Sequence, residues 1–598
     1  MSDYRAPIDE MRFVLREIAG LDSVAALPGC EEATPELVDA ALAEAGKLAG
    51  EVLGPLNHSG DQDGARLENG VVRTPSGFKE AYDAYVAGGW NGVPFEPGFG
   101  GQGLPWLVST ALNEMWSSAN LSFSLCPLLT QGAVDLLTAH GSDAQKATYL
   151  PKMISGEWTG TMNLTEPQAG SDVGALRTRA VREGDHYRIT GQKIYITYGE
   201  HDLTDNIVHM VLARTPDAPP GVKGISLFIV PKYLPKPDGS PGERNDLRVA
   251  SIEHKLGIHA SPTCVMAYGD GGGAIGYLVG EECRGIEYMF TMMNNARLGV
   301  GLQGVAIAER ALQQARAYAH ERTQGRDPSG KGGDAPAAII RHPDVRRMLM
   351  TMRAQTEAVR ALAYYAAAGL DGARRDPDAD RRRAIQARVD LLIPVVKAWS
   401  TDVGVEVASI GVQIHGGMGF IEETGAAQHY RDARIAPIYE GTNGIQALDL
   451  FGRKLMRDRG EAMRSLIAEM RSLDADLAAG RGDDIEVIRL ALDTAIGTLE
   501  RATEALIEIA RDDMAAAAAG ASYYLRLTGT VVGGWLLAKG ALAALRQMEA
   551  GEGDPGFLEA KLVTARFYAE HIVPTGTALL APIERGGRSV MALADDQI

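Results

Sequence analysis

Cysteine is scarce in this sequence of 598 residues. The four thiols, Cys30, Cys126, Cys264 and Cys283, lie far apart and form no CxxC pair, which argues against a zinc site and a disulfide framework. An apolar leader segment, an Arg-rich and Ser-rich transit pattern and a myristoylation signal are also absent near the first Met. We therefore expect a cytoplasmic protein without a bound metal.

Positive charge is in deficit as well. The formal net charge is -18 and the isoelectric point is about 5.2, which excludes a basic surface built to neutralise nucleic-acid phosphates. Long uninterrupted apolar runs are missing too. The most apolar late stretch, Thr528 to Leu545, contains Lys539 and four glycines, so we expect a packed helix there and no transmembrane segment.

The spacing of apolar residues divides the chain into four regions. Residues 1–159 and 285–450 show helical spacing, as in PELVDAALAEAGKLAGEVLGPL and PDVRRMLMTMRAQTEAVRALAYYAA. Residues 160–284 change to short runs such as YRITGQKIYIT, DNIVHMVLA and GISLFIVP, which predict a small β-domain. Residues 451–598 predict an appended helical bundle. Tyr233 to Arg244 is expected to be a loop between strands, and Asp327 to Ala335 a surface loop between helices.

Two polar segments lie where the first helical region meets the β-domain. MNLTEPQAGSD, residues 162–172, gathers hydroxyls and a glycine where a domain junction favours a cofactor cleft. On its own it is better explained as a turn with a side-chain bond from Asp172. In GQKIYITYGEHD, residues 191–202, Tyr195 and Thr197 would share one strand face, which suits covering a planar ring but also suits an ordinary strand.

A glycine-rich segment, QIHGGMGF, occupies residues 413–420 after a helix expected to end near Ile410. Gly416, Gly417 and Gly419 would let the backbone approach a ligand, and consecutive N–H groups can hold a pyrophosphate. No GxGxxG within a βαβ unit precedes the segment, so it does not match a dinucleotide fingerprint. His415 is better explained by packing than by ligand binding, and no spaced ligand set for a metal accompanies it.

Glu440 lies in RDARIAPIYEGTNGIQALDL, residues 431–450, between an Ile-Tyr pair and Gly441. An apolar setting raises the pKa of a carboxylate toward neutrality, which suits a base that accepts a carbon-bound proton. Taken alone, the segment is better explained by a surface glutamate beside a helix N-cap at Thr442 or Asn443.

The ordered set of segments resembles the acyl-CoA dehydrogenase family over about residues 30–450. The resemblance implies a helical domain, a barrel-like middle β-domain and a helical bundle with FAD as the cofactor. It assigns flavin contacts to residues on both sides of the β-domain, with Tyr195 standing where many members have Trp. The implied FAD contacts are Met162, Leu164, Thr165, Ser171, Tyr195, Thr197, Arg322, Gln324, Gln413, Gly416, Gly417 and Thr442.

The sequence departs from the family pattern at several points. ERTQGR offers Arg322 and Gln324 but lacks the family's aromatic residue, and EGTNGIQ stands in place of EGTSxIQ. Some relatives carry the base on the helix after the β-domain, where this chain has Asn294, Asn295 and Ala296 without a carboxylate. The resemblance therefore implies that Glu440 is the catalytic base. It also implies substrate contacts from Ser171, Asn294, Arg297 and Gly441.

The resemblance implies α,β-dehydrogenation of an acyl-CoA, in which Glu440 takes the α-proton and flavin N5 accepts the β-hydride. The added C-terminal region is similar to a branch of about 600 residues that includes 3-methylmercaptopropionyl-CoA and broad-range long-chain enzymes. An electron-transfer flavoprotein is the expected electron acceptor, and shared flavin sites imply a homo-oligomer, at least a dimer. Two alternatives stay open: an acyl-CoA oxidase, and a catalytically silent flavin-fold protein that binds acyl-CoA.

Overall fold

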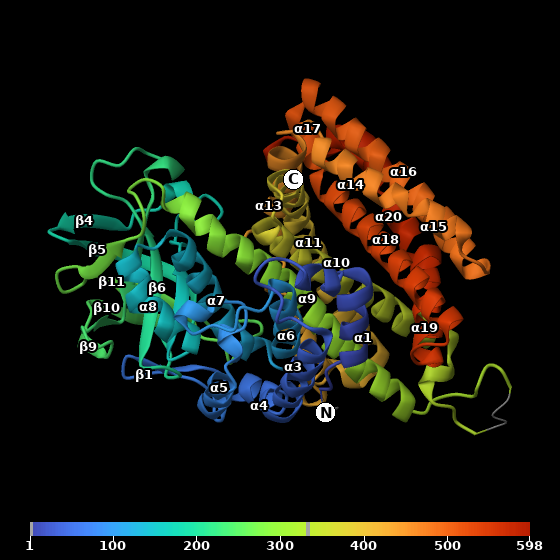
Figure 1. The fold of residues 1–598 in the computed structure, drawn as a ribbon, viewed down its shortest axis with the longest axis horizontal. Coiled ribbons are helices and arrows are strands. Elements are labelled where there is room, and N and C mark those ends of the chain that lie inside the picture. Colours follow the sequence, from blue (N-terminus) through green and yellow to red (C-terminus); the bar gives the residue numbers. More distant parts are fainter. Residues whose placement is uncertain (1–3, 331–334) are drawn as a thin grey trace. The chain divides into compact units, whose positions relative to one another are not determined.

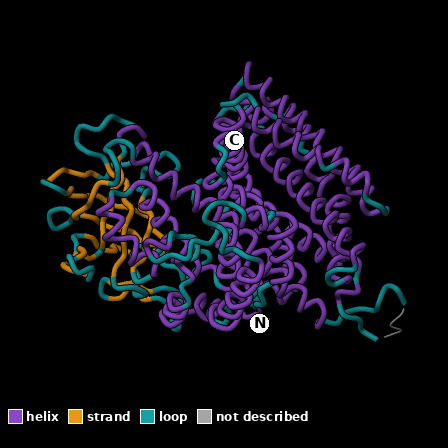
Figure 2. Tube along the Cα trace, viewed as in Figure 1, coloured by secondary structure: helices purple, strands orange, loops and turns teal. Residues whose placement is uncertain are grey.

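The computed structural model of the chain describes residues 4–330 and 335–598. Four positions of the predicted surface loop at Asp327 to Ala335 thus lie outside the described residues. The chain divides into two compact units, which we call the β-unit, Glu44–Gly299, and the helical unit, which combines the residues before Glu44 with Val300–Ile598. Figure 1 labels their elements, and Figure 2 shows that the strands are confined to the β-unit.

The β-unit joins short helices to one curled sheet. The sheet order is β10, β11, β5, β12, β7, β6, β3, with β4 paired to β5; β3 and β6 run parallel and the other pairs antiparallel. Its strands are β3 (Trp158–Asn163), β4 (Arg179–Glu183), β5 (His186–Thr197), β6 (Asn206–Ala213), β7 (Ser226–Pro231), β10 (Leu247–Ile252), β11 (Thr263–Tyr268) and β12 (Ala274–Leu278). The helices are α4 (Leu56–Asp63), α5 (Phe78–Ala87), α6 (Trp106–Ala119), α7 (Leu121–His140) and α8 (Asp143–Ser155).

The central strands β6 and β7 are buried along their whole length because the sheet separates two apolar cores. Val208, Met210 and Leu212 of β6 belong to one core, which also takes residues of α7 and α8. Val211 and Ala213 belong to the other core, which is formed mainly by residues of the strands. Successive side chains of β6 therefore point alternately into the two cores, and not alternately into a core and into solvent.

The helical unit contains three long helices and the appended C-terminal region. The long helices are α9 (Gly285–Glu321, whose first half belongs to the β-unit), α10 (Pro343–Arg375) and α11 (Ala379–His415). The shorter ones before the appended region are α1 (Ile8–Phe13), α2 (Leu21–Ala25), α3 (Pro35–Lys47, which crosses the unit boundary), α12 (Ala426–Ala433) and α13 (Asn443–Leu448). The appended helices are α14 (Glu461–Ser472), α15 (Asp474–Ala479), α16 (Asp483–Asp512), α17 (Met514–Ala519), α18 (Ala521–Ala550), α19 (Pro555–Phe567), α20 (Val573–Thr577), α21 (Leu580–Arg585) and α22 (Gly587–Val590).

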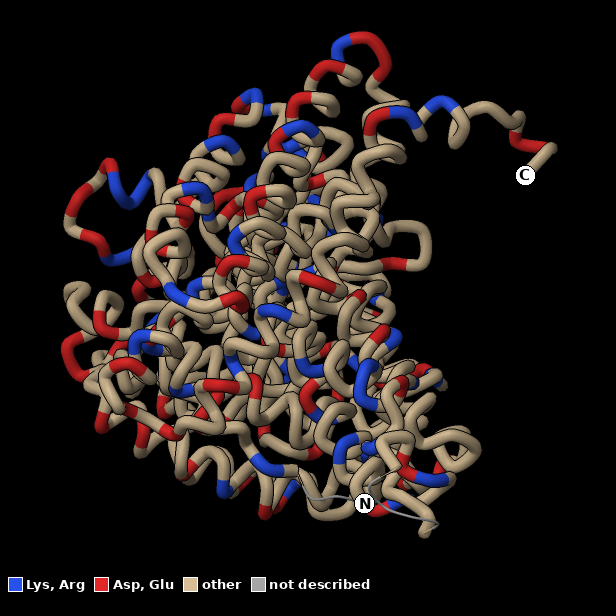
Figure 3. Tube along the Cα trace, turned by 90° about the vertical axis from the view of Figure 1, so that its right-hand side faces the viewer, with Lys and Arg blue, Asp and Glu red and all other residues tan. Residues whose placement is uncertain are grey.

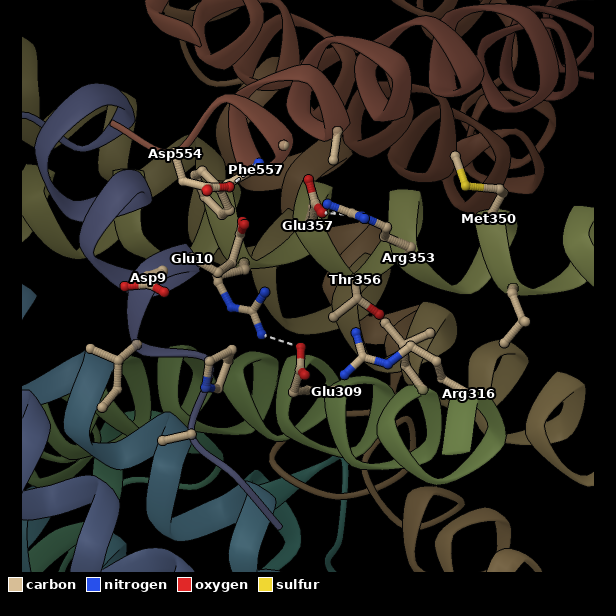
Figure 4. Close-up of a pocket in the computed structure, with 18 of the residues that line it drawn as sticks. Asp9, Glu10, Glu309, Arg316, Met350, Arg353, Thr356, Glu357, Asp554 and Phe557 are labelled. Carbon is tan, nitrogen blue, oxygen red and sulfur yellow. Dashed lines mark hydrogen bonds and ion pairs between the residues drawn. The ribbon is translucent and has the colours of Figure 1, made fainter. Parts of the chain in front are cut away.

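A buried ion-pair network joins the two ends of the chain inside the helical unit. Lys561 of α19 contacts Glu10 of α1 and Glu357 of α10, and Arg353 contacts Glu357 at 2.7 Å. Beside this network lies a cavity of about 690 Å³, shown in Figure 4, in which Arg360 pairs with Glu309. None of the residues predicted to bind flavin or substrate lines this cavity. The network explains why the first helices belong to the same unit as the last.

The predicted fold class, mainly α with a central β-domain and an appended C-terminal helical bundle, is confirmed. The four proposed domain limits stay a prediction. The first helical region contains an unexpected hairpin, β1 (Arg66–Glu68) and β2 (Val71–Arg73), whose turn residues Asn69 and Gly70 both have positive φ. The predicted loop from Tyr233 to Arg244 is instead a hairpin of β8 (Tyr233–Pro235) and β9 (Pro241–Arg244).

Two helices, Leu121–His140 and Ala521–Ala550, are long and apolar enough to cross a membrane by composition alone. In each, 89% of the apolar window is buried inside the protein, as in core helices. Figure 3 shows Lys and Arg interspersed with Asp and Glu along the chain. Many exposed ion pairs join neighbours one turn apart, such as Lys79 with Asp83, and pairs of this kind contribute little to stability.

Candidate functional site

The TEPQAGSD segment forms a loop directly after β3. Met162 is in the strand and half-buried, Leu164 is buried, Thr165 is half-buried and Ser171 is exposed. Glu166 and Ala169 exchange backbone hydrogen bonds that close the loop, and Asp172 accepts from the Gly174 backbone N–H at 3.0 Å. The turn interpretation of Asp172 is therefore correct, while Thr165 and Ser171 remain accessible to a ligand.

A buried salt bridge anchors this loop to β5. The Lys193 ammonium donates to a Glu166 carboxylate oxygen and to the Leu164 carbonyl, both at 2.8 Å. Glu166 also accepts from the backbone N–H groups of Arg177 and Thr178 and from the Thr178 hydroxyl. Burial lowers the pKa of Lys193 to about 8. Burial alone would raise the pKa of Glu166, but the charge of Lys193 and these hydrogen bonds outweigh it and lower that pKa to about 2.

Tyr195 and Thr197 lie at the end of β5, at a β-bulge. Opposite Cys264 and Met266 of β11 stand Ile196 and Lys193, so β5 carries one extra residue. Tyr195 has φ of 59° and is 60% exposed, Ile196 is buried and Thr197 is half-buried. Both predicted contacts are thus accessible, and the bulge directs an exposed aromatic ring into solvent, where a cofactor ring can stack on it.

The first half of α9 carries the two predicted substrate residues of that helix. Asn294 is exposed and Arg297 is buried. The neighbouring Asn295 donates to the Asp135 carboxylate of α7 at 3.5 Å, and Ala296 is buried. No carboxylate occupies this stretch of the helix, which leaves the position used by some relatives without a base.

Glu440 lies in a tight turn between α12 and α13. Its φ is 56° and that of Gly441 is 84°, so two consecutive residues are left-handed. A non-glycine residue in this region costs of the order of 1–3 kcal/mol and persists only when its surroundings hold it. The buried Gln446 side chain donates to the carbonyls of Glu440 and Gly441, both at 3.2 Å. The turn therefore fixes the half-buried Glu440 at a set place.

The residues around Glu440 complete this turn. Thr442 is exposed and caps α13 by accepting from the Ile445 backbone N–H, so the N-cap interpretation also holds. The Tyr439 hydroxyl donates to Gln303 of α9. Burial, with the charge of Glu440 as a second cause, raises the pKa of Tyr439 well above its ordinary value. The tyrosine is consequently a neutral hydrogen-bond donor and packing group.

The glycine-rich segment follows α11, which runs to His415 and not only to Ile410 as predicted. Gln413 is exposed on its last turn, and Gly416 and Gly417 are exposed with open space where a side chain would begin. Gly419 differs: it is buried, and an added Cβ would lie 2.2 Å from the Val412 carbonyl oxygen. We expected Gly419 to let a ligand approach the backbone. Instead, its backbone packs against α11, so this glycine is required for internal packing.

His415 is a packing histidine. Its imidazole Nδ1 lies 2.7 Å from the Gly411 carbonyl oxygen, and its ring stacks on Tyr318 with centroids 4.4 Å apart. Burial lowers the pKa of His415. These contacts match the packing interpretation made from the sequence.

The contrast between Gly417 and Gly419 makes a first prediction. Gly419→Ala is expected to destabilise the protein by roughly 1–3 kcal/mol or more, because the methyl group overlaps the backbone of α11. Gly417→Ala should leave the melting temperature of the apoprotein unchanged but weaken FAD binding. Thermal melts with and without added FAD measure both effects; equal melting temperatures for the two apoproteins would contradict the assignment of Gly419.

Arg322 and Gln324 follow the end of α9. Both are exposed, and the Gln324 backbone N–H donates to the Ala337 carbonyl at 2.9 Å. Several large apolar side chains in and after the glycine-rich segment are exposed, with Phe420 85% exposed. The others are Met418, Ile421 and Tyr430.

Sequence reasoning missed the residues that hold the site together. Glu166 and Lys193 lie inside the two quoted motifs, yet neither was singled out, because their pairing depends on the strand register. Asn443 was considered only as an N-cap and as part of EGTNGIQ, although its side chain contacts Lys397, Ala398, Thr401 and Asp402 of α11. The one signal in the sequence was that an acidic and a basic residue, Glu166 and Lys193, lie in segments that are otherwise expected to be buried, where charges are usually paired.

The family models match the chain in consecutive segments. The N-terminal domain model of acyl-CoA dehydrogenase matches residues 66–157, the middle domain model residues 161–270 and the C-terminal domain model residues 283–455. A further model, "Acetyl-CoA dehydrogenase C-terminal like", matches residues 462–594. This fold and these domains define an oxidoreductase that acts on acyl-CoA thioesters.

Two curated relatives span the whole chain. The 3-methylmercaptopropionyl-CoA dehydrogenase of Ruegeria pomeroyi is 49% identical over 98% of this chain and 99% of its own length. The broad-specificity linear acyl-CoA dehydrogenase FadE5 of Mycobacterium tuberculosis is 35% identical over 99% of both chains. The chain belongs to the acyl-CoA dehydrogenase family, whose cofactor is FAD.

A solved acyl-CoA dehydrogenase from Bacillus anthracis, complexed with FAD, has the same fold. It aligns with a TM-score of 0.73 and 21% identity, covering 98% of this chain and 92% of that one. The appended helical region is therefore part of a known full-length architecture.

Proposed function

We propose that this protein catalyses α,β-dehydrogenation of an acyl-CoA thioester to the trans-2-enoyl-CoA, with Glu440 as the base. The observation that supports this most directly is the Glu440 turn. Gln446 holds the backbone of Glu440 in a left-handed conformation. Residues 294–296 contain no carboxylate that could act as the base instead. Backbone strain maintained by surrounding contacts is characteristic of functional positions.

The reaction requires a base, a hydrogen-bond donor to the thioester carbonyl and a hydride acceptor. An α C–H is a weak acid, so the Glu440 carboxylate must lie within reach of that hydrogen as it leaves as a proton. The thioester carbonyl must meet a hydrogen-bond donor while negative charge develops on its oxygen, and the Glu440 backbone N–H is our candidate. FAD, when bound, supplies the acceptor that takes the β-hydrogen as hydride at N5. Ser171, Asn294, Arg297 and Gly441 are our candidates for orienting the substrate.

Except for the buried Leu164, the residues assigned to FAD fit such a group by their accessibility. Tyr195 presents an exposed ring beside the bulge, and the Thr165 and Ser171 loop is rigidly anchored through Glu166. Gly416 and Gly417 expose backbone with no side chain in the way, as a pyrophosphate would require. Met162, Leu164, Thr197 and Thr442 complete the flavin contacts in this proposal, and Arg322, Gln324 and Gln413 the outer half.

We further propose a homodimer whose interface includes Phe420 and its neighbours Met418, Ile421 and Tyr430. All four side chains are exposed, and α12, which carries Tyr430, contacts residues 416–420, so this region offers apolar surface to a second copy. A monomeric mass in light scattering at micromolar concentration would contradict it.

Activity on a panel of thioesters tests the function. The purified protein with FAD is given acyl-CoAs of increasing chain length and 3-methylmercaptopropionyl-CoA, and loss of the oxidised flavin band under anaerobic conditions is followed. Our proposal, supported by the relative from Ruegeria pomeroyi, is that the methylthio compound or a fatty acyl-CoA bleaches the flavin and yields the 2-enoyl product. Failure of every thioester to bleach a FAD-loaded protein would exclude the dehydrogenation.

The electron acceptor is distinguished in a second assay. We propose electron-transfer flavoprotein, so air-saturated turnover should produce little hydrogen peroxide and should depend on that protein. Stoichiometric peroxide without it would instead indicate an oxidase.

A further inference from the structure

The side chain of Asn443, three residues after Glu440, is held by five polar contacts with one turn of α11. Its amide oxygen accepts from the Lys397 ammonium at 2.8 Å and lies 3.4 Å from the Thr401 hydroxyl oxygen. Its amide nitrogen lies 2.7 Å from an Asp402 carboxylate oxygen and 3.0 Å from both the Ala398 carbonyl and the Thr401 hydroxyl. An asparagine amide has two donor hydrogens and one acceptor oxygen, so this side chain is fully used.

Lys397 is completely buried, and its helix lies close against α9. An added Cβ on Gly304 of α9 would meet the Ser400 carbonyl oxygen at 2.2 Å, so the two backbones touch at the level of this cluster. An ammonium in such a place is costly unless it is hydrogen-bonded. The position of Lys397 therefore fixes the place of the Asn443 amide.

Asp402 closes the other side of the cluster. Its side chain is accessible from a cavity of about 260 Å³ that Arg526 and His571 of the appended region also line. Burial raises the pKa of this carboxyl, which the hydrogen bond from Asn443 and the charge of Arg526 partly offset. Asp402 and Lys397 thus orient one amide from opposite ends.

The held amide is connected to the Glu440 turn by short backbone links. The Asn443 backbone N–H donates to the Pro437 carbonyl at 3.0 Å, which closes a loop around residues 438–442. Gln446, one turn further along α13, holds the Glu440 and Gly441 carbonyls. Motion of Asn443 would therefore move both ends of the strained turn.

We propose that Lys397 and Asp402 are positioning residues for the catalytic base, acting on Glu440 through Asn443. The proposal rests on the proposed role of Glu440. Neither residue needs to touch substrate: Lys397 and Asp402 set the place of α13, and α13 sets the direction of the Glu440 carboxylate. In this way the carboxylate keeps its alignment with the α-hydrogen.

Lys397→Met tests the proposal with a side chain of similar length and no charge. We expect kcat to fall roughly 10- to 100-fold, since misplacement of a reacting group by about 1 Å has effects of that size. KM and FAD content should stay near wild type, because the variant leaves the substrate and flavin contacts in place. The primary isotope effect with α-deuterated substrate should increase, because proton abstraction becomes more rate-limiting.

Lys561→Met is the matched control. Lys561 is another buried lysine of the same unit, but it contacts Glu10 and Glu357 instead of the turn. This control should lower the melting temperature without changing kcat or the isotope effect. If both variants lower kcat equally, or if Lys397→Met keeps the wild-type kcat and isotope effect, the positioning role is excluded.

A pair of substitutions at Asp402 keeps the test open if Lys397→Met does not fold. Asp402→Asn retains an acceptor oxygen for the Asn443 amide and should retain activity, whereas Asp402→Leu should lower kcat and increase the isotope effect. Equal kcat in the two would overturn the role of Asp402. An active Glu440→Gln enzyme would refute the base itself, whereas an inactive one beside a fully active Lys397→Met enzyme would refute only the positioning.

Discussion

The Glu440→Gln variant is expected to fold, bind FAD and lose turnover by several orders of magnitude. Glutamine has nearly the same size and can accept the same left-handed turn, since Gln446 holds backbone carbonyls and not the carboxylate. General base catalysis contributes about 10²- to 10⁴-fold on its own. The loss should be at least of that order, because no second carboxylate stands at residues 294–296.

Single-turnover bleaching of the flavin with a saturating thioester measures this loss directly. The flavin spectrum and its shift on thioester addition should match wild type, which shows that binding survives. Glu440→Asp is the informative companion: it keeps a carboxylate one methylene shorter and should recover part of the rate. Wild-type bleaching in Glu440→Gln would remove Glu440 from the role of base.

Much of the fold could be predicted because each region has its own period. The switch from helical spacing to short strands at about Gly160 coincides with β3, and β5, β6 and β7 begin within two residues of the quoted runs. The β1–β2 hairpin was missed although Asn69-Gly70 is a strong turn signal, because two three-residue strands are too short to show a period. The end of α11 was misplaced because its last turn, before Gly416, contains polar residues.

The candidate site was predictable only as a set of segments. Motif order indicated Glu440 and the flavin loop, since each is contiguous in sequence. The supports are not contiguous: Lys397 and Asn443 are 46 residues apart, and Glu166 and Lys193 are 27 apart. Such pairings depend on helix crossing and strand register, which no local pattern encodes. The bulge that exposes Tyr195 is hidden for the same reason.

Lys193→Met is expected to cost the protein its FAD. The substitution leaves the Glu166 carboxylate buried without its ammonium partner, and breaking a buried pair in this way costs about 3–5 kcal/mol. It also frees the Leu164 carbonyl and so loosens the loop that carries Thr165 and Ser171. We expect the purified variant to be largely colourless and its FAD affinity to fall at least about tenfold, which is 1.4 kcal/mol.

Lys232→Met is the matched control for this loss. Lys232 forms another buried pair of the β-unit, with Glu200, and neither residue belongs to the TEPQAGSD loop. Its replacement should lower stability by a similar amount and leave the FAD affinity of the folded fraction unchanged. Should Lys232→Met lose FAD as readily as Lys193→Met, general destabilisation would explain the effect, and the anchoring role would be wrong.

The double variant Lys193→Met, Glu166→Gln separates pairing from charge burial. Removing both charges should restore part of the stability, because no unpaired carboxylate remains.

The pH dependence of stability provides a second test of the Glu166 anchor. Because its pKa is lowered from 4.5 to about 2, Glu166 contributes stability above pH 4.5 that is lost as pH falls toward 2. Wild type should therefore lose this extra stability on acidification and the double variant should not, so parallel curves for the two proteins would show that Glu166 is not the charged anchor of the flavin loop.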